Sequence, residues 1–579
     1  MKKLTTHLKS YTKECILGPL FKLLEATLEL IVPLVIASLI DNGINSTVLT
    51  NTDKQSYIIR MSVILVVLGA VGLLFSVIAQ YFAAKASCGF VARVRKSLFS
   101  HVQTLSYQEI DEIGTSTLIT RITTDSNQVQ NGLNLALRLL LRSPFVVFGA
   151  MIMAFTIDFE SALNFAIIIP ILSVIVFGIM LISIPIQKNV QKNVDSVVKA
   201  TRENLFGTRV IRAFCKEESK IQEFGEKTNN LNAIQKLAGK ISALLNPLTY
   251  IVINLAIIFL IYTGAIQVNI GNLTQGQVVA LYNYMSQILI ELIKLANLII
   301  SIIKAIASAS RIQSIMEIEK SQDFGNETLK DGDGTVSFKN VSFTYSGSSE
   351  SSLSDISFSC NSGETVGIIG GTGSGKTTLI NLIPRFYDVT SGEIFISGKN
   401  IKEYNEEDLR NFVAVVPQKA MLFSGTIRDN MLWGNKTATD EEINKALEIA
   451  QATSVVKDKG GLDAKIEQDG RNLSGGQRQR LTIARAIVGN PKILILDDSA
   501  SALDYATDAK LRCALKDIEN TTKFIVSQRT SSIMHADKII VLDDGEIVGI
   551  GTHSDLLSSC LIYKEIYDTQ FSAGGGNNE

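Results

Sequence analysis

Long apolar stretches fill the first half of this 579-residue chain and limit the folds open to it. Six of them have roughly 20 residues or more, enough to cross the hydrocarbon core of a bilayer as helices. Their approximate limits are 16–40, 58–83, 134–157, 161–186, 242–268 and 277–303. We therefore expect an α-helical membrane domain of six spans over 1–310, with its first span in place of a cleaved signal.

Charge separates this half from the rest of the chain. Residues 1–310 hold 27 Lys+Arg and 18 Asp+Glu, a net charge of +9, whereas residues 311–579 hold 28 and 38, a net charge of −10. This balance predicts a basic membrane domain joined to an acidic soluble one, and it argues against a nucleic-acid-binding protein. The six cysteines show no C-x-x-C spacing, so they indicate neither a zinc site nor a disulfide framework.

Basic residues gather in the connections on one side of the spans. They precede span 1, follow span 2 and follow span 4, whereas the connections at 158–160 and 268–275 lack Lys and Arg. The positive-inside rule then places both termini and the soluble region in the cytoplasm of a multi-pass protein of the cell (inner or plasma) membrane. The long inner connections, 84–133 and 187–241, are rich in helix formers and contain no proline, which predicts helices continuing below the membrane.

Charged residues inside the spans are costly and therefore candidates for function. Glu291 lies near the middle of span 6, and Lys294 follows it at helical spacing. Two interpretations stay open, a substrate contact by Glu291 in a central cavity or a Glu291 and Lys294 pair that neutralises itself. Arg138 and Arg142 are expected in the inner headgroup layer, where long basic side chains reach the interface.

A glycine-rich segment in the second half follows a short apolar run, Thr365–Gly370, and precedes a helix-forming run. Gly370 to Thr377 reads GGTGSGKT and fits G-x-x-x-x-G-K-[ST] with the required strand before and helix after. In this context a chance glycine-rich turn is the weaker interpretation. Backbone N–H groups of such a loop cradle phosphates, Lys376 would reach the β- and γ-phosphates, and Thr377 would hold Mg²⁺.

Two further segments of the second half are typical of nucleotide-binding proteins with a P-loop. The apolar run 493–496 ends in Asp497, a carboxylate of the type that holds Mg²⁺ in P-loop NTPases. Leu473-Ser-Gly-Gly-Gln477 opens a helix-forming run before it. This segment resembles the signature of ATP-binding cassette (ABC) proteins. With six spans before one cassette, nearly the whole chain resembles an ABC exporter half-transporter.

The resemblance implies roles for individual positions. Tyr345 matches the aromatic that stacks on adenine, although on its own it could be an exposed strand tyrosine, and Gln418 matches the glutamine loop. ATP would be bound by Tyr345, Gly370, Gly371, Thr372, Gly373, Ser374, Gly375, Lys376, Thr377, Thr378, Gln418 and Asp497, with Mg²⁺ held by Thr377, Gln418 and Asp497. The signature would be Leu473, Ser474, Gly475, Gly476 and Gln477, and the loop facing the partner cassette Ser501, Ala502, Leu503 and Asp504. Segments 114–125 and 203–214 resemble those carrying the two coupling helices.

Two positions depart from the family pattern. Asp498 occupies the place of the glutamate that polarises the attacking water, and Gln528 occupies the place of the switch histidine. The aspartate is one methylene shorter, and a misplacement of about 1 Å can cost about 10²-fold in rate. Glutamine cannot carry the charge of an imidazolium or shuttle a proton. With the P-loop and Asp497 intact, these two catalytic positions predict a site that binds ATP tightly and hydrolyses it slowly.

The resemblance implies an ATPase that exports amphipathic or hydrophobic compounds, of the multidrug type, by alternating access. Because each ATP in this family lies between one P-loop and the other chain's signature, we expect a heterodimer in which this chain's signature completes the partner's competent site. A homodimeric lipid or peptide exporter, or a membrane-tethered regulatory ATPase, is the alternative. Besides the second half-transporter, the expected partners are the bilayer and a small amphipathic substrate. The expected domains are a membrane domain over 1–310, a linker over 311–335, an α/β P-loop cassette over 336–571 and a disordered tail over 572–579.

Overall fold

The computed structural model describes residues 2–46, 50–330 and 332–572, which form two compact units. The first, called the membrane unit, comprises the chain up to Gln103 and the segment Ser116–Ile318. The second, called the nucleotide unit, comprises Thr104–Thr115 and the chain from Glu319 onward. The predicted tail lies, apart from Ser572, outside the described residues.

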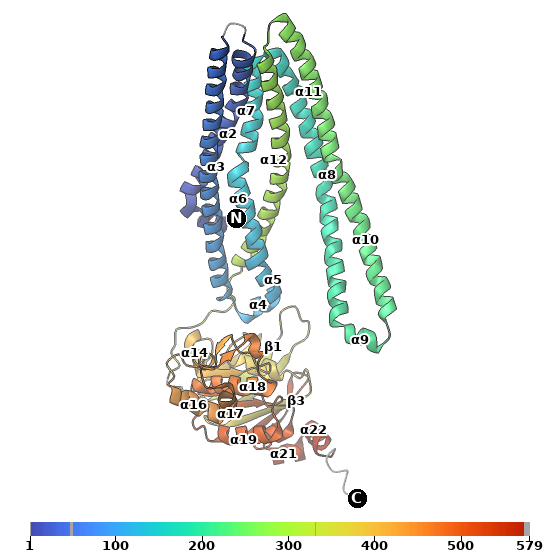
Figure 1. Cartoon of the computed structure of the whole chain (residues 1–579). Helices are drawn as coiled ribbons and strands as arrows, with labels where there is room; N and C mark the ends of the chain where they lie inside the picture. Colours follow the sequence, from blue (N-terminus) through green and yellow to red (C-terminus); the bar gives the residue numbers. More distant parts are fainter. Residues whose placement is uncertain (1, 47–49, 331, 573–579) are drawn as a thin grey trace. The chain divides into compact units, whose positions relative to one another are not determined.

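The described residues of the membrane unit form helices and short connections, with no β-strand among them. Figure 1 shows α2 beside α3, and α8 and α10 running together as a two-helix arm that α9 closes. The α-helices are α1 (Lys2–Leu8), α2 (Thr12–Ser38), α3 (Asn51–Val102), α5 (Thr115–Thr120), α6 (Ser126–Leu139), α7 (Arg142–Ile157), α8 (Phe159–Phe206), α9 (Thr208–Ala213), α10 (Glu217–Ala243), α11 (Leu245–Ile270) and α12 (Gln275–Met316). The predicted continuation of helices beyond the apolar stretches is confirmed, since α3 and α8 have 52 and 48 residues.

Five continuous helical segments of the described chain are long and apolar enough to cross a membrane. They are Thr6–Ile44, Asn51–Val102, Thr115–Ile157, Phe159–Phe206 and Glu217–Ile270. The expected sixth span falls in α12, which is helical over 42 residues but is not one of these five. The sixth span therefore stays a prediction.

The centre of the membrane unit is built around α12. Its buried face, which includes Tyr284, Met285 and Ile288, packs in one cluster with residues of α2, α7, α8 and α11. The Tyr284 hydroxyl donates a hydrogen bond to the carbonyl of Leu30 in α2, at 2.6 Å. Because an unpaired polar group among apolar neighbours costs free energy, this bond allows a tyrosine in the core.

Three β-sheets organise the nucleotide unit. The central sheet has the order β12-β11-β3-β10-β9-β6, parallel except for its edge strand β12, and a four-stranded antiparallel sheet has the order β2-β1-β4-β5. A short pair, β7 (Gly425–Thr426) and β8 (Lys465–Ile466), forms the third. The other strands are β1 (Val336–Phe343), β2 (Leu353–Cys360), β3 (Thr365–Gly370), β4 (Ser391–Ile396), β5 (Lys399–Asn400), β6 (Val413–Val416), β9 (Ile493–Asp497), β10 (Thr522–Val526), β11 (Lys538–Asp543) and β12 (Glu546–Gly551).

Helices accompany these strands. They are α4 (Tyr107–Ile113), α13 (Lys376–Leu382), α14 (Glu406–Phe412), α15 (Ile427–Met431), α16 (Asp440–Ile449), α17 (Thr453–Lys459), α18 (Gly475–Val488), α19 (Tyr505–Lys516), α20 (Thr530–Ile533), α21 (His553–Ser559) and α22 (Leu561–Ser572). The predicted α/β character of this half is therefore confirmed.

The register of the central sheet explains why distant motifs meet. Val526 of β10 lies opposite both Ile368 of β3 and Asp497 of β9. All three strands are parallel, so their carboxyl ends fall at one edge of the sheet, where open α/β folds place their ligands. The segments that follow the three strands carry the P-loop, Asp498 and Gln528.

Candidate nucleotide-binding site

The P-loop connects β3 to α13 in a conformation that requires glycine. Gly373 and Gly375 have φ angles of 86° and 91°, in the left-handed region that other residues adopt only with strain. A Cβ on Gly375 would also lie 2.7 Å from the carbonyl oxygen of Ser352. The loop therefore presents its backbone where no side chain blocks an approaching ligand.

Lys376, the first residue of α13, is 9% exposed. Its ammonium donates hydrogen bonds to the carbonyls of Gly370, at 3.0 Å, and Gly371, and to the hydroxyl of Ser374, at 3.2 Å. Burial lowers the pKa of Lys376, although the carboxylates of Asp498 and Asp497 oppose this shift. Phosphate oxygens would be stronger acceptors for this ammonium than the neutral oxygens it now contacts.

Asp497 ends β9 and is 5% exposed. The hydroxyl of Thr377 lies 3.2 Å from each of its carboxylate oxygens. Burial raises the pKa of Asp497, and the negative charge of Asp498 adds to the effect, against the hydrogen bond from Thr377 and the charge of Lys376. A hydroxyl and a carboxylate held this close form an oxygen donor set that suits Mg²⁺, whose charge would stabilise the ionised aspartate.

Replacing Asp497 by asparagine is therefore expected to stabilise the nucleotide-free protein while removing its response to magnesium. A raised pKa means that the folded state disfavours the ionised form, so this group lowers stability as the pH rises through that pKa. We expect Asp497→Asn to raise the melting temperature at neutral pH by about 2 °C, the order of effect of about 1 kcal/mol in a domain of this size. The gain should shrink at pH 5, and the extra stabilisation by Mg-ATP should be lost.

Nucleotide-dependent thermal unfolding measures both effects. Asp544→Asn is the matched control, because Asp544 lines the same cavity but the hydroxyl of Thr377 is hydrogen-bonded to Asp497. A nucleotide-free Asp497→Asn protein that melts below the wild type would contradict the prediction.

Asp498 follows β9 in an unusual backbone conformation, with a φ angle of 43°. Its N–H donates to the carbonyl of Val526 at 3.0 Å, and its carboxylate accepts a hydrogen bond from the amide of Gln418 at 3.3 Å. Gln528 follows β10 and is exposed at the same sheet edge. The two positions that depart from the family pattern thus lie on adjacent strand ends, beside Asp497.

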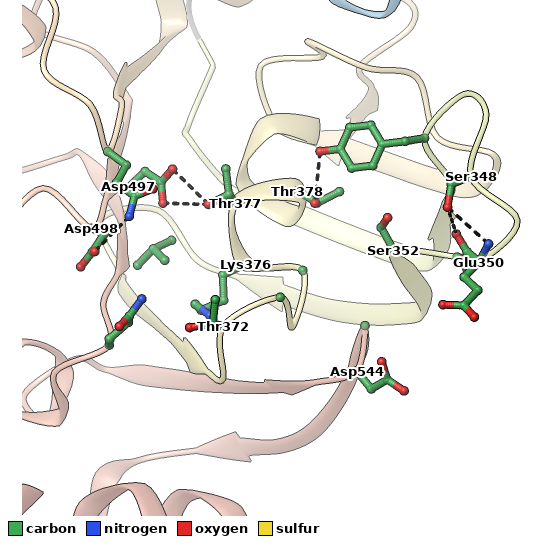
Figure 2. A pocket seen from close by; sticks show the side chains of 18 residues that line it. Ser348, Glu350, Ser352, Thr372, Lys376, Thr377, Thr378, Asp497, Asp498 and Asp544 are labelled. Carbon is green, nitrogen blue, oxygen red and sulfur yellow. Dashed lines mark hydrogen bonds between the residues drawn. The ribbon is translucent and has the colours of Figure 1, made fainter. Parts of the chain in front are cut away.

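These residues surround one cavity of about 490 Å³. Figure 2 shows Asp497 and Asp498 on one side of it, Ser348, Glu350 and Ser352 on the other, and Lys376, Thr377 and Thr378 between them. The predicted residues that line it are Tyr345, Thr372, Gly373, Gly375, Lys376, Thr377, Thr378, Gln418, Asp497, Asp498 and Gln528. Gly370, Gly371 and Ser374 belong to the same loop but are not among its lining residues.

Sequence reasoning missed a second group of lining residues. These are Ser348, Glu350, Ser351, Ser352, Val526, Asp544 and Gly545. The Asp-Gly pair at 544 and 545 has positive φ angles of 44° and 82°, as a tight hairpin turn between β11 and β12 requires. Because Leu542 of β11 lies opposite Gly370 of β3, that turn falls beside the P-loop. The Asp-Gly pair indicates a turn from the sequence alone, but its position beside the P-loop depends on the pairing of β11 with β3.

Tyr345 lies at the edge of this cavity, half-buried. Its hydroxyl is 3.2 Å from that of Thr378, and its ring packs edge-on against Phe343 and Tyr387, with centroids 4.8 Å and 5.4 Å away. A ring held on two sides by aromatic neighbours offers a pre-oriented surface for a nucleotide base.

The signature segment lies elsewhere in the nucleotide unit. Ser474 caps α18 by accepting a hydrogen bond from the N–H of Gln477, whose side chain in turn accepts one from the N–H of Ser474. Gly475 and Ala502 line a second cavity of about 500 Å³, while none of the described residues lining the first cavity belongs to the signature. Leu473 and Leu503 are buried, and Asp504 caps α19.

The short helix α4 packs within the nucleotide unit, although the chain enters it from α3 and leaves it for α5. Tyr107 stacks on Phe386 with centroids 4.5 Å apart, and the hydroxyl of Tyr387 donates to the carboxylate of Asp111 at 2.6 Å. We expected the first coupling helix within 114–125, but Ser116 onward belongs to the membrane unit. The segment that joins the nucleotide unit is Thr104–Thr115, so that prediction was about ten residues too late.

Glu291 lies in a buried cluster of charges in the membrane unit. It is 3% exposed and accepts hydrogen bonds from Arg142 (2.7 Å), Ser143 (2.7 Å) and Lys294 (2.8 Å), while Arg142 also pairs with Glu29 at 2.5 Å. The structure contains the Glu291 and Lys294 ion pair that one of the two interpretations predicted. The other interpretation, a contact between Glu291 and the substrate, stays a prediction. The headgroup position expected for Arg142 is wrong, because its side chain is 7% exposed and bound to two carboxylates from other helices.

Comparisons with known proteins agree with this architecture. The family model for the ABC transporter transmembrane region matches residues 15–292, and that for the ABC transporter matches residues 353–501. An uncharacterized ABC transporter ATP-binding protein of Bacillus subtilis (strain 168) is 34% identical over 580 residues, covering 100% of both chains. The ATP-dependent lipid A-core flippase of Escherichia coli (strain K12) is 31% identical over 536 residues, covering 92% of this chain and 91% of the flippase.

A solved structure shares the fold of nearly the whole chain. It is that of a bacterial Atm1-family ABC exporter with ATP bound, with a TM-score of 0.79 and 21% identity, covering 97% of this chain and 98% of that one.

Proposed function

From the premise that this chain belongs to the ABC transporter family, as an exporter half-transporter whose ATPase activity is coupled to transport, we propose that it works in a heterodimer. In this proposal the chain binds ATP and Mg²⁺ at its own P-loop but hydrolyses that ATP slowly. Its signature completes the competent ATP site of a different half-transporter. The pair exports amphipathic or hydrophobic compounds across the cell membrane, with both termini and the nucleotide units in the cytoplasm.

The observation that carries the proposal is the composition of the first cavity. It contains the groups that would bind a magnesium nucleotide, including Lys376, Thr377 and Asp497, next to Asp498 and Gln528 in the positions that would drive hydrolysis. Binding and hydrolysis make different demands, since binding needs donors for phosphate whereas hydrolysis also needs a base placed on the attacking water. The cavity offers donors for phosphate, as binding requires. As a base for hydrolysis it offers the shorter carboxylate of Asp498, which already accepts a hydrogen bond from Gln418.

The signature supports the second half of the proposal. Ser474, Gly475 and Gln477 keep the capped helix start that would point N–H groups at a phosphate, yet they are not among the lining residues of the chain's own P-loop cavity. Because this signature does not line the P-loop cavity of its own chain, the nucleotide that it would contact is the one bound to the partner's P-loop. The expected partner carries glutamate and histidine at the positions of Asp498 and Gln528.

Two cargo classes fit an exporter of this kind. Multidrug efflux is the first, because the spans are mostly aliphatic. Lipid export is the second, and it is the activity named for one relative, the lipid A-core flippase. Export of either class, by this pair or by a homodimer, is distinguished from a regulatory ATPase by stimulation of ATP hydrolysis when cargo is added to reconstituted vesicles.

The test of the heterodimer compares magnesium-dependent ATPase activity of this chain alone with that of the chain co-purified with the product of a neighbouring half-transporter gene. We expect the lone chain to be nearly inactive and the pair to be active. Replacing Ser474 by arginine in this chain should abolish the activity of the pair, because a bulky cation there blocks the partner's ATP.

A matched control uses Lys376→Ala in the same pair, which should leave hydrolysis at the partner's site measurable. A lone chain that assembles and hydrolyses ATP as fast as the pair would contradict the proposal.

A further inference from the structure

A polar cavity opens in the membrane unit where α6 meets α12. Its volume is about 370 Å³. The lining residues are Gln128, Asn131, Gly132, Asn134, Leu135, Arg138 and Ser301. All but Ser301 come from α6, at spacings of three and four residues that place them along one side of a helix.

The two helices approach closely beside this cavity. A Cβ on Gly132 would lie 2.1 Å from the Cβ of Ala305, so only glycine allows α6 and α12 to pack at this distance. The close approach brings Ser301 of α12 to the polar side chains of α6. The close packing of α6 against α12 at Gly132 and Ala305 therefore fixes the position of the cavity wall.

Polar groups of this cavity lack partners. The Oδ1 atom of Asn134 and the Nε atom of Arg138 are buried, and neither has a hydrogen-bond partner within the part of the chain that the structure describes. Nor does Arg138 form an ion pair with any described residue, whereas Arg142, four residues later, binds Glu29 and Glu291. Two arginines four residues apart are thus in different environments. Arg142 is neutralised by carboxylates, whereas Arg138 lines a cavity whose other polar lining residues are Gln128, Asn131, Asn134 and Ser301.

This difference defines the kind of ligand that the cavity accepts. Arginine offers five N–H donors and no acceptor, and the amides of Gln128, Asn131 and Asn134 can add N–H donors through their NH₂ groups. The unpaired Oδ1 of Asn134 is an acceptor and would not contact an anion, so the unpaired Nε of Arg138 is the observation that favours an anionic ligand. No carboxylate is found among the described lining residues. A half-buried cation without a counter-charge is costly near the membrane, and it gains most from an anion that accepts its hydrogen bonds.

The position of the cavity indicates how such an anion is presented. Arg138 lies four residues after the start of the predicted span 134–157, about 6 Å along the helix axis, and Ser301 lies near the end of the predicted span 277–303. By the predicted orientation, both positions are at the cytoplasmic ends of their spans. An anionic head group attached to an apolar tail fits this depth.

We propose that the cavity between α6 and α12 binds the anionic head group, of phosphate or carboxylate type, of an amphiphile, with the guanidinium of Arg138 as its main donor and the Nδ2 group of Asn134 as a second one. This inference rests on the proposed export function and narrows its cargo to anionic amphiphiles. An anionic lipid and a soluble anionic amphiphile share this chemistry.

The test titrates the assembled, nucleotide-free transporter in phosphatidylcholine nanodiscs with dodecyl phosphate and measures binding by native mass spectrometry. Dodecyltrimethylammonium, with the same tail and the opposite charge, and inorganic phosphate, with no tail, are the comparison probes. We expect dodecyl phosphate to bind more tightly than either. Arg138→Gln should raise its dissociation constant about tenfold, the loss typical of a charge-assisted contact, while Arg138→Lys should stay within about threefold of the wild type.

Two further variants keep the result interpretable. Asn134→Ala, which keeps the arginine, should weaken dodecyl phosphate about threefold and serves if Arg138→Gln does not assemble. Lys192→Gln removes an exposed cation of α8 that does not line the cavity, and it should change nothing.

Equal dissociation constants for the wild type, Arg138→Gln and Asn134→Ala would overturn the proposal, as would equal affinity for the cationic amphiphile. Inorganic phosphate binding as tightly as dodecyl phosphate would overturn the assignment to an amphiphile. Because the titration contains no ATP, it fails or succeeds independently of hydrolysis. An amphiphile that binds but is not exported on addition of ATP would contradict the proposed export function. The assignment of the cavity's ligand would still hold in that case.

Discussion

Replacing Asp498 by glutamate together with Gln528 by histidine is expected to raise ATP hydrolysis at this chain's own site by about 10²-fold. The added methylene would advance the carboxylate by about 1 Å toward the attacking water, and the histidine would restore a group able to hold and transfer a proton. The measurement is ATPase activity of the assembled pair in which the partner's P-loop lysine has been replaced, so that only this site turns over.

The matched control is Asp498→Asn with Gln528→His. Asparagine tolerates the positive φ angle of position 498 as well as aspartate does, but it carries no carboxylate. Its rate should stay at or below that of the wild type. A glutamate variant that hydrolyses ATP no faster than the wild type would show that these two residues do not limit this site.

Removing the side chain of Arg142 is expected to destabilise the membrane unit by about 3 kcal/mol or more. Arg142→Met leaves the carboxylates of Glu29 and Glu291 without the cation that joins α2, α7 and α12. Breaking a buried ion pair costs more than the pair itself contributes, because the remaining charge has lost its partner. Unfolding of the protein by SDS titration in mixed micelles measures the change in free energy.

Two variants separate this effect from general loss of charge. Arg142→Met combined with Glu291→Gln should recover part of the stability, since it removes a buried carboxylate whose only remaining cationic partner among the described residues is Lys294. Lys294→Met should cost less than about 1 kcal/mol, because Lys294 is 45% exposed and Arg142 still pairs with Glu291. The role assigned to Arg142 fails if its loss costs no more than that of Lys294.

Much of the nucleotide site was predictable because its chemistry is encoded locally. The P-loop, Asp497 and the signature each occupy a few adjacent positions, and the strands that carry them are short apolar runs. Their convergence also follows from a general rule, since parallel strands end at one edge of a sheet. Eleven of the predicted residues therefore line the same cavity.

The parts that escaped prediction depend on contacts between distant segments. Arg142 binds residues 113 and 149 positions away, and no local pattern distinguishes it from Arg138, which has neither partner. Gly545 lies beside the P-loop because β11 pairs with β3, and Ser352, just before β2, has its carbonyl oxygen close to both Gly375 and Gly545. The shift of the docked helix from the expected 114–125 to Tyr107–Ile113 has the same origin, because the distant aromatic residues Phe386 and Tyr387 pack against Tyr107 of α4.

In the proposed heterodimer, this chain holds ATP at its own site and hydrolyses it more slowly than the partner hydrolyses ATP at the competent site. The direct measurement lets the assembled pair turn over Mg-ATP, removes free nucleotide rapidly and identifies the nucleotide crosslinked to each chain through a photoreactive base analogue. We predict intact triphosphate on this chain, beside Tyr345, and diphosphate on the partner. Diphosphate on both chains in equal amounts would contradict the account.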